Sequence, residues 1–234
     1  LLIGGEADLS VQTMWKEPLS GDTDGVAERL TKLSNIGCAL IRFSVPDESS
    51  AEYLGVIAQK SPIPVVADIH FDYRLALSCI ERGVHKIRIN PGNIGASWKV
   101  REVLTAAGER GIPIRVGVNS GSLPKSLRGH GDTAEAMVEA AEMEMELFEK
   151  LSFRDVVYSL KSSDIDTTVR ANRLFSQKYS FPLHLGVTEA GPLIPGVVKS
   201  SVAMSMLIRE GIGDTIRVSL SDSPENEVIT GMEI

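Results

Sequence analysis

The sequence predicts an α/β protein of the (β/α)8 TIM-barrel class, a single domain over residues 1–234 with a short extended N-terminal plug. Short apolar runs that suit buried strands alternate without a break with amphipathic segments that suit helices. Several of these helices end in a glycine a few residues before the next strand, as in NIG, ERG and REG. Eight such repeats in 234 residues indicate that the parallel sheet closes into a barrel.

The expected strands follow from apolar runs with period-two alternation. In chain order they cover residues 9–14, 38–45, 63–70, 85–90, 113–119, 155–162, 182–189 and 215–220. The opening residues LLIG form the expected plug, followed by a glycine turn. An open doubly wound sheet is the alternative, but it usually has fewer strands and an early glycine-rich phosphate fingerprint, which this sequence lacks.

Helices are expected between the strands, where apolar residues recur at helical spacing. They cover residues 24–36, 50–60, 73–83, 98–110, 133–151, 164–179 and 199–210, and an eighth only begins near residue 223. Ser223 and Pro224 suit the N-cap and first position of that last helix, and Glu225 and Glu227 suit its dipole. Two segments remain as loops, the long glycine-rich 121–131, whose length is typical of functional loops, and AGPLIPG.

The βαβ unit over residues 63–93 carries the clearest sign of chemistry, because both of its strands end in charged or polar residues. Alternation places Asp68 and His70 on one face of the first strand, and Arg88 and Asn90 on one face of the second. The apolar residues between them point the other way, under the helices. Polar side chains at the carboxyl ends of barrel strands are where TIM-barrel enzymes carry their active sites.

The same alternation rule, applied to every strand, collects one inward-facing polar set near the carboxyl ends. The set contains Arg42, Ser44, Asp68, His70, Arg88, Asn90, Arg115, Asn119, Ser159, Lys161, His184, Thr188, Arg217 and Ser219. Five members are cations, and only Asp68 and Glu189 are expected nearby to compensate them. The natural partner of such a cluster is an anion with two or more charges, and several arginine forks suit a diphosphate better than a single carboxylate.

Less specific interpretations remain open for individual members of this set. A single strand arginine often forms a salt bridge at the rim, and His70 and His184 both suit hydrogen-bonded core histidines. Asp68 and His70 have the spacing of a metal pair, but no third ligand is evident, so no metal site is predicted. His85 and His130 are expected to be structural or solvated. Nothing resembles a Ser–His–Asp nucleophile site.

Composition limits the class of protein. A net charge of −7 argues against a general nucleic-acid binder, and no apolar run approaches the length of a membrane span, so a cytoplasmic or plastid-stromal location is expected. The two cysteines, Cys38 and Cys79, form no CxxC motif and are interpreted as small buried hydrophobic residues. We therefore expect this chain to hold no zinc ion or iron–sulfur cluster by itself.

Eight segments resemble the family of 4-hydroxy-3-methylbut-2-enyl diphosphate synthases, iron–sulfur oxidoreductases of the methylerythritol phosphate route to isoprenoids. The segments are SVQTM, IRFSVP, VVADIHFD, IRINPGNIG, IRVGVNSGSL, SLKSSD, PLHLGVTEAG and GIGDTIRVSL. The resemblance implies reductive opening of 2-C-methyl-D-erythritol 2,4-cyclodiphosphate with two electrons and loss of water. It also implies a separate C-terminal domain with a 4Fe-4S cluster, reduced by ferredoxin or flavodoxin, and a homodimer in which that domain closes over the partner's barrel.

The resemblance also implies roles for individual residues. It assigns the diphosphate to Arg42, Arg88, Arg115, Lys161 and Arg217, with Asn90, Asn119 and Ser219 as hydrogen-bond partners. Asp68, His70 and Glu189 match positions near the ligand's hydroxyl and carbon skeleton, and proton delivery to the leaving oxygen is a role for one of them. The alternation rule adds His184 to the substrate-binding set and leaves Glu189 out of phase, at the start of a loop.

The sequence departs from the family pattern because it stops before the cluster domain. We expect it to bind the substrate without turning it over, as a monomer or in a different pairing. Two alternative functions stay open. A pterin-binding barrel of the dihydropteroate synthase type would use similar Asp, Asn, Lys and Arg residues, although five cations exceed the needs of a neutral pterin. A non-catalytic phospho-ligand receptor would need none of Asp68, His70 and Glu189.

Overall fold

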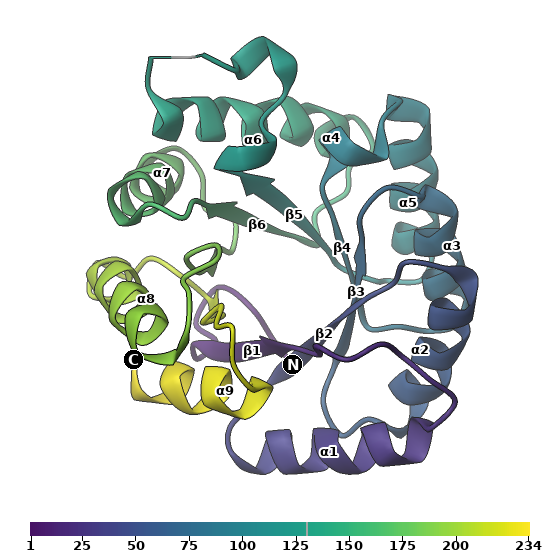
Figure 1. Ribbon diagram of the computed structural model, residues 1–234. Helices are drawn as coiled ribbons and strands as arrows, with labels where there is room; N and C mark the ends of the chain where they lie inside the picture. The colour runs from purple at the N-terminus through teal and green to yellow at the C-terminus, as the bar shows by residue number, and fades with distance from the viewer. Residues whose placement is uncertain (130) are drawn as a thin grey trace.

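The computed structural model describes residues 1–129 and 131–234, so the predicted loop histidine, His130, lies outside the described residues. Eight parallel strands of the described chain pair in the order β6-β5-β4-β3-β2-β1-β8-β7, and a bridge between Tyr158 and Leu183 joins β6 to β7. Figure 1 looks into the resulting ring, with the helices on its outside. The predicted (β/α)8 barrel is confirmed.

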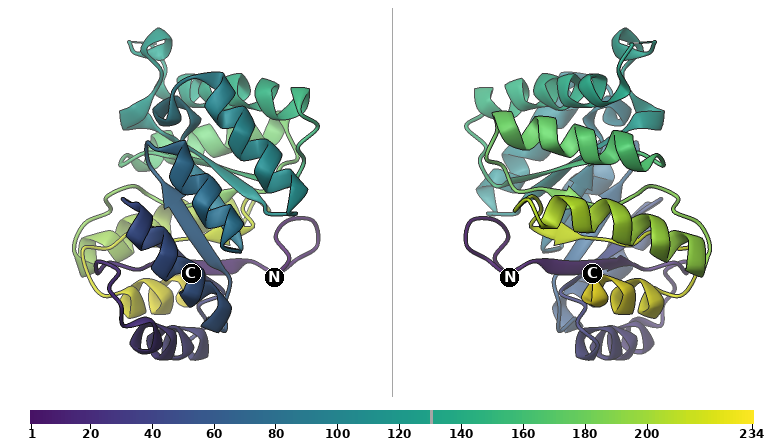
Figure 2. Two further views of the ribbon diagram at one scale, coloured as in Figure 1. Left: turned by 90° about the vertical axis from the view of Figure 1, so that its right-hand side faces the viewer. Right: turned by 90° about the vertical axis from the view of Figure 1, so that its left-hand side faces the viewer.

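The strands and helices alternate along the chain. The strands are β1 (Ser10–Met14), β2 (Leu40–Ser44), β3 (Val65–Ile69), β4 (Lys86–Ile89), β5 (Ile114–Asn119), β6 (Val156–Lys161), β7 (His184–Leu185) and β8 (Thr215–Ile216). The helices are α1 (Thr23–Asn35), α2 (Glu48–Lys60), α3 (Tyr73–Glu81), α4 (Pro91–Ile94), α5 (Ser97–Glu109), α6 (Thr133–Lys150), α7 (Ile165–Lys178), α8 (Leu193–Ile208) and α9 (Pro224–Glu233). Figure 2 shows the helices along the outer side of the strands.

The apolar core lies between the sheet and the helices. Outward-facing strand residues such as Ile41, Phe43 and Ile87 are 0% exposed and belong to it, together with Leu54 of α2 and Phe148 of α6. Burying one such side chain contributes roughly 1.5–3 kcal/mol, so this shell holds the helices on the sheet.

The inside of the barrel is unusually polar for this fold, whose interior is commonly filled by branched apolar side chains. Gln12, Lys86, Arg115 and His184 are all buried there, with at most 5% of each exposed. Strand register sets the charged residues side by side, because Asp68 pairs with Arg88 and Arg88 with Arg115. The parallel register thus concentrates charge at one level of the barrel.

Aspartates cap five of the helices at the end of the barrel where the strands finish. The N-caps are Asp22, Asp47, Asp72, Asp132 and Asp164, and each side chain accepts a hydrogen bond from a backbone N–H of its helix. Such a cap typically contributes about 1 kcal/mol. These carboxylates are engaged by the helices and do not line the main cavity.

Several elements of the structure differ from the expectations. Strands β7 and β8 have two residues each, and an isolated bridge between Gly191 and Leu220 joins the segments that follow them. The short helix α4 was not expected. Helix α9 has ten residues, whereas only the start of a helix was expected.

Helix α8 begins six residues earlier than expected, at Leu193 instead of Lys199. The loop prediction was wrong because Pro195 falls in the first turn, where a proline is tolerated since no intrahelical bond needs its N–H. Gly196 allows this turn to pack closely, since a Cβ there would lie 2.4 Å from the side chain of Leu220. The expected N-terminal plug is a loop whose first residues, Leu1 and Leu2, are 64% and 82% exposed.

Candidate functional site

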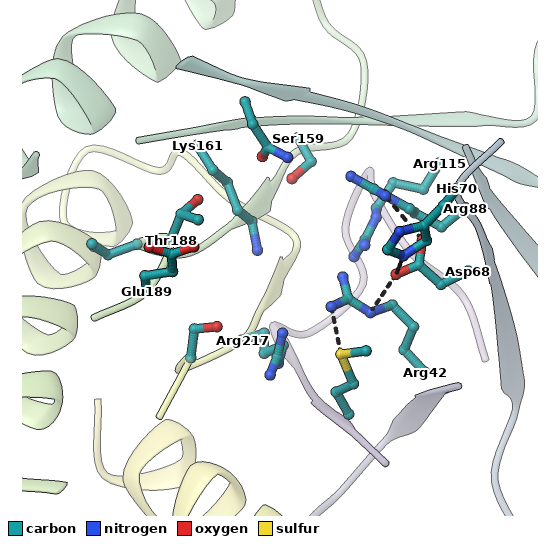
Figure 3. Close-up of a pocket in the computed structure, with 14 residues that line it drawn as sticks. Arg42, Asp68, His70, Arg88, Arg115, Ser159, Lys161, Thr188, Glu189 and Arg217 are labelled. Carbon is teal, nitrogen blue, oxygen red and sulfur yellow. Dashed lines mark hydrogen bonds and ion pairs between the residues drawn. The ribbon is translucent and has the colours of Figure 1, made fainter. Parts of the chain in front are cut away.

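One cavity of about 330 Å³ lies at the carboxyl ends of the strands, the end at which TIM-barrel active sites occur. It is lined by Met14, Arg42, Asp68, His70, Arg88, Arg115, Asn119, Ser159, Lys161, Val187, Thr188, Glu189, Arg217 and Ser219. Figure 3 shows these side chains converging from opposite sides of the barrel. Ten of the twelve predicted catalytic and substrate-binding residues therefore line one cavity.

Asp68 organises one wall of this cavity. Its carboxylate lies 2.9 Å from Nη1 of Arg88, 3.3 Å from Nε of Arg42 and 3.4 Å from Nε2 of His70 (Figure 3). Burial alone would raise the pKa of Asp68, but Arg42, His70 and Arg88 outweigh it and hold that pKa below its usual range. Asp68 is therefore ionised and orients three side chains at once.

His70 is the most accessible member of this wall, with half of its side chain exposed. It follows β3 at the strand end, as the alternation rule predicted, and its imidazole faces the ionised Asp68. An imidazole that is held by a carboxylate and faces a cavity is placed to exchange a proton with a group bound there.

Arg42 carries a second contact beside the carboxylate. Its Nη2 lies 2.7 Å from the sulfur of Met14, so the side chain spans from β1 to β3 (Figure 3). Burial lowers the pKa of Arg42 to about 10, although Asp68 acts in the opposite direction. The guanidinium is nevertheless charged near neutral pH and remains available to an anion.

Arg115 and Lys161 face the cavity without a carboxylate partner among the described residues. Burial and the neighbouring cations lower the pKa of both side chains well below the ordinary values. Within residues 1–129 and 131–234, the one side-chain hydrogen bond of Arg115 is a long contact of 3.5 Å to Gln12, and the buried Nε of Arg115 has no partner there. An anionic ligand in the cavity would satisfy both groups and reverse the lowering.

Arg217 is paired from behind by a residue that sequence reasoning had assigned only to the dipole of the last helix. Glu227 accepts hydrogen bonds from Nε and Nη2 of Arg217, both at 3.0 Å. The available signal was the helical periodicity of α9, because Glu227 shares its buried face with Pro224, Val228 and Gly231. A glutamate on a buried face needs a cation, and Arg217 is the cation on the preceding strand end.

The remaining wall comes from the segment after β7. Thr188 and Glu189 lie across the cavity from Asp68 (Figure 3), and Glu189 was expected at the start of a loop. Its φ of 50° lies in the left-handed region, which costs a non-glycine residue roughly 1 kcal/mol or more. Such backbone strain is commonly retained where it aims a side chain into a functional site.

Two predicted substrate-binding residues, Asn90 and His184, do not line the cavity. The Nδ2 of Asn90 donates to Ser122 at 3.1 Å and so links the segments that follow β4 and β5. His184 is 1% exposed, and its Nδ1 lies 2.5 Å from Oγ1 of Thr215 below the cavity. Burial and nearby cations lower the pKa of His184 well below its usual value, so this histidine is neutral.

No group of three or more His, Cys, Asp or Glu residues in 1–129 and 131–234 is arranged to hold a metal ion. Cys38 and Cys79 are buried on different elements, and burial raises the pKa of their thiols to about 11 and about 12. Neither thiol is suited to bind iron. The residues described here therefore do not fit a 4Fe-4S cluster. Within the same ranges, no helix combines the length and the apolar character needed to cross a membrane.

A family model described as the GcpE TIM-barrel domain matches residues 1–232. The chain belongs to the GcpE family. The family assignment agrees with the resemblance found in the sequence and covers nearly the whole chain. It does not favour the alternative of a pterin-binding barrel of the dihydropteroate synthase type.

Curated relatives of this GcpE-family chain share one name, 4-hydroxy-3-methylbut-2-en-1-yl diphosphate synthase (flavodoxin). The protein of Thermodesulfovibrio yellowstonii is 54% identical over 99% of this chain and 67% of its own length. The proteins of Treponema denticola and Geobacter sulfurreducens are 48% and 49% identical, and the match covers 66% of each. The chain thus spans about two thirds of the length of these relatives.

Solved structures with similar folds include a dihydropteroate synthase from Yersinia pestis, with a TM-score of 0.68, 12% identity, and coverage of 97% of this chain and 90% of that one. A deoxyribose phosphate aldolase from Aeropyrum pernix has a TM-score of 0.59 and 12% identity, and covers 95% and 89%. At these identities the likeness concerns the barrel fold alone.

Proposed function

We propose that this chain is the substrate-binding barrel of a 4-hydroxy-3-methylbut-2-en-1-yl diphosphate synthase, and that its cavity binds the cyclic diphosphate substrate. The observation that carries this proposal is a pair of cations, the buried Arg115 and the half-buried Lys161, which face the cavity without a carboxylate partner among the described residues. Because buried charge is costly unless it is paired, the cavity requires an anion. The names of the relatives support a diphosphate as that anion.

In this proposal the cations have different roles. Arg115 and Lys161 neutralise the phosphate groups, while Arg217 presents a donor fixed by Glu227. Arg42 and Arg88 are already paired with Asp68, so they add hydrogen bonds more than net charge. Asn119 and Ser219 supply uncharged hydrogen-bonding groups at the rim.

The opposite wall supplies the proton. His70, oriented by the ionised Asp68, donates to the oxygen that leaves the ligand's carbon skeleton, and Glu189 approaches the same region from across the cavity. In the whole enzyme a 4Fe-4S cluster would supply electrons. The described residues of this chain do not hold that cluster, so the chain alone binds substrate but does not turn it over.

Two partners belong to the proposal for the full-length enzyme. Flavodoxin as the electron donor is supported by the names of the relatives, although ferredoxin serves the same chemistry. A homodimer is supported by exposed apolar side chains along α8, where Ile194, Val198, Val202 and Met206 are 39–75% exposed at a spacing of four residues. Sedimentation analysis of the full-length enzyme measures that association.

Calorimetric titration with the cyclic diphosphate, at two salt concentrations, tests the binding function. We expect saturable binding that weakens as salt rises, and a loss of tenfold or more in Arg115→Met and in Lys161→Met, since a hydrogen bond between charged groups is worth about 1.5–3 kcal/mol. Lys150→Met is the control, because Lys150 is 72% exposed and lies on α6. Equal binding by all four proteins would contradict the assignment of the cavity.

A second experiment distinguishes an enzyme from a non-catalytic phospho-ligand receptor by comparing the wild-type protein with a His70 variant. His70→Gln keeps the size of the side chain but removes the titrating imidazole. In the full-length enzyme, we expect this substitution to lower kcat by at least tenfold and to leave substrate affinity within about threefold. Unchanged turnover would favour a role for this wall in binding alone.

A further inference from the structure

Glu227 is fully buried, which is rare for a glutamate. It lies on α9, and no residue of that helix lines the cavity. Its surroundings nevertheless connect it to the cavity through Arg217, one of the lining residues. What this glutamate does for the site is therefore a question of what it does to that arginine.

The carboxylate of Glu227 is surrounded only by donors. Oε2 accepts from Oγ1 of Thr13 at 2.7 Å and from Nε of Arg217 at 3.0 Å. Oε1 accepts from Nη2 of Arg217 at 3.0 Å and from the backbone N–H of Leu220 at 3.1 Å, and it lies 2.9 Å from Nζ of Lys16. A glutamine would turn its amide hydrogens toward one of these donors, so the position requires two accepting oxygens.

This arrangement fixes the plane of the Arg217 guanidinium. A bidentate pair uses the Nε and Nη2 edge, and it leaves the Nη1 hydrogens for another partner. Thr13 at β1 and Lys16 just after it hold the carboxylate from the other side, so the clamp joins β1, the end of β8 and α9. Burial alone would raise the pKa of Glu227, but Arg217, Lys16 and Thr13 together hold it below its ordinary value, so the clamp is ionised at neutral pH.

We propose that Glu227 is a positioning residue that acts through Arg217, holding the guanidinium in the orientation in which it donates to a phosphate group in the cavity. The proposal rests on the proposed function, because it needs an anionic phosphate ligand at Arg217. It goes beyond that function by assigning a role to a residue that has no contact with the cavity.

An electrostatic role and a positioning role for Glu227 predict opposite changes in anion affinity when the glutamate is neutralised. If the glutamate only added negative charge beside the cavity, its neutralisation would raise the local potential and tighten anion binding. If it positions Arg217, neutralisation releases the guanidinium and weakens anion binding. A purely structural role would lower stability and leave the affinity of the folded protein unchanged.

The test is calorimetric titration of the wild-type chain, Glu227→Gln and Glu225→Gln with inorganic pyrophosphate. Glu225 is the matched control, because it lies two residues away on α9 and forms its ion pair, at 3.1 Å, with Arg29 outside the cavity. We expect about tenfold weaker binding for Glu227→Gln and a change within twofold for Glu225→Gln. Equal or tighter binding by Glu227→Gln overturns the proposal.

A second pair of variants tests the route through Arg217. Arg217→Met and the double variant Arg217→Met with Glu227→Gln should bind pyrophosphate equally, since the second substitution then has nothing to position. A further loss in the double variant overturns that route.

If circular dichroism shows that Glu227→Gln does not fold, Glu227→Asp replaces it. This variant keeps the negative charge, but its shorter side chain does not reach both nitrogens of Arg217. Unchanged affinity of Glu227→Asp overturns the proposal. A wild-type chain that does not bind pyrophosphate instead contradicts the proposed function, and with it this inference.

Discussion

Individual charges in this barrel differ in how completely they are balanced. Asp68 forms ion pairs with Arg42 and Arg88, and Glu227 forms one with Arg217. The cations deeper in the barrel have no carboxylate partner among the described residues. Lys86 is the clearest case, since it is 5% exposed and the charged group that acts on its pKa is another cation, Arg115. Burial, followed by Arg115, lowers the pKa of Lys86 to about 7.

This lowering makes Lys86 a cost to stability with a defined pH window. The unfolded chain binds the proton up to the ordinary value of 10.5, whereas the folded chain releases it above about 7. The free energy of unfolding therefore rises with pH between about 7 and 10.5. Below about pH 7 the destabilisation caused by the buried ammonium is complete. At 1.36 kcal/mol per pKa unit that cost is at most roughly 5 kcal/mol.

Lys86→Met should therefore stabilise the protein by at least about 1 kcal/mol at pH 7, and by much less at pH 10. Urea denaturation at both pH values measures this difference. Lys150→Met on the exposed face of α6 serves as the control and should change stability by less than about 0.5 kcal/mol at either pH. A lower stability of Lys86→Met at pH 7 would mean that the ammonium has a stabilising partner.

At the scale of the elements, a glycine in β5 and another just after β7 leave space for long cationic side chains. A Cβ at Gly117 of β5 would lie 2.7 Å from Nη2 of Arg88, and one at Gly186 would lie 2.8 Å from Nζ of Lys161 and 2.6 Å from the carbonyl oxygen of Arg217. Contacts this short require the neighbour to move. Both glycines thus belong to the packing of the cavity wall.

We expect Gly186→Ala to lower stability by roughly 1–3 kcal/mol and to weaken pyrophosphate binding, because the added methyl meets backbone and displaces Lys161. Gly108→Ala in α5 is the matched control, since its Cβ would meet only Phe153 at 3.8 Å. That control should gain up to about 1 kcal/mol from helix propensity. Thermal unfolding with and without pyrophosphate compares the two, and equal behaviour would rule out a role for Gly186 in the wall.

Sequence reasoning found the elements and the faces of the strands, because alternation in residues such as Arg42 and Asp68 depends only on the pleat. It did not predict how far along the barrel axis each inward-facing residue lies from the cavity. His184 has the correct face but begins β7, one layer below the cavity, and Asn90 follows β4 where the chain already turns into α4. Glu227 was missed because its partner is an arginine ten residues away across a turn, and local periodicity does not name a partner.

For the whole molecule, the ring of strands has one weak point. Strands β1 to β6 pair in continuous ladders, whereas β6 meets β7 through the single bridge of Tyr158 and Leu183. The backbone hydrogen bonds that cross this seam include those from the N–H of Tyr158 to the carbonyl of Pro182 and from the N–H of Thr188 to the carbonyl of Ser162, both at 2.9 Å. Lys161, at the end of β6, and Thr188, after β7, lie on the two sides of this seam, and both line the cavity.

Hydrogen exchange should therefore be faster at the amides of Tyr158 and Thr188 than at the amides of Ile41 and Ala67 in the continuous part of the sheet. Pyrophosphate should slow the exchange of the first pair by at least fivefold, since a ligand held by Lys161 and Arg217 spans the seam. The second pair should change by less than twofold. Uniform protection of all four amides would show that the ring opens as one unit.

The clamp of Glu227 also bears on how the barrel is assembled during synthesis. Thr13 and Glu227 are separated by 214 residues, so the contact between them forms only after α9 has left the ribosome. Until then Arg217 has no buried counter-charge, and β1 lacks the helix that covers it. The nascent barrel therefore stays open beside β1 until α9 packs there, and this packing completes both the cavity wall and the charge balance of Arg217.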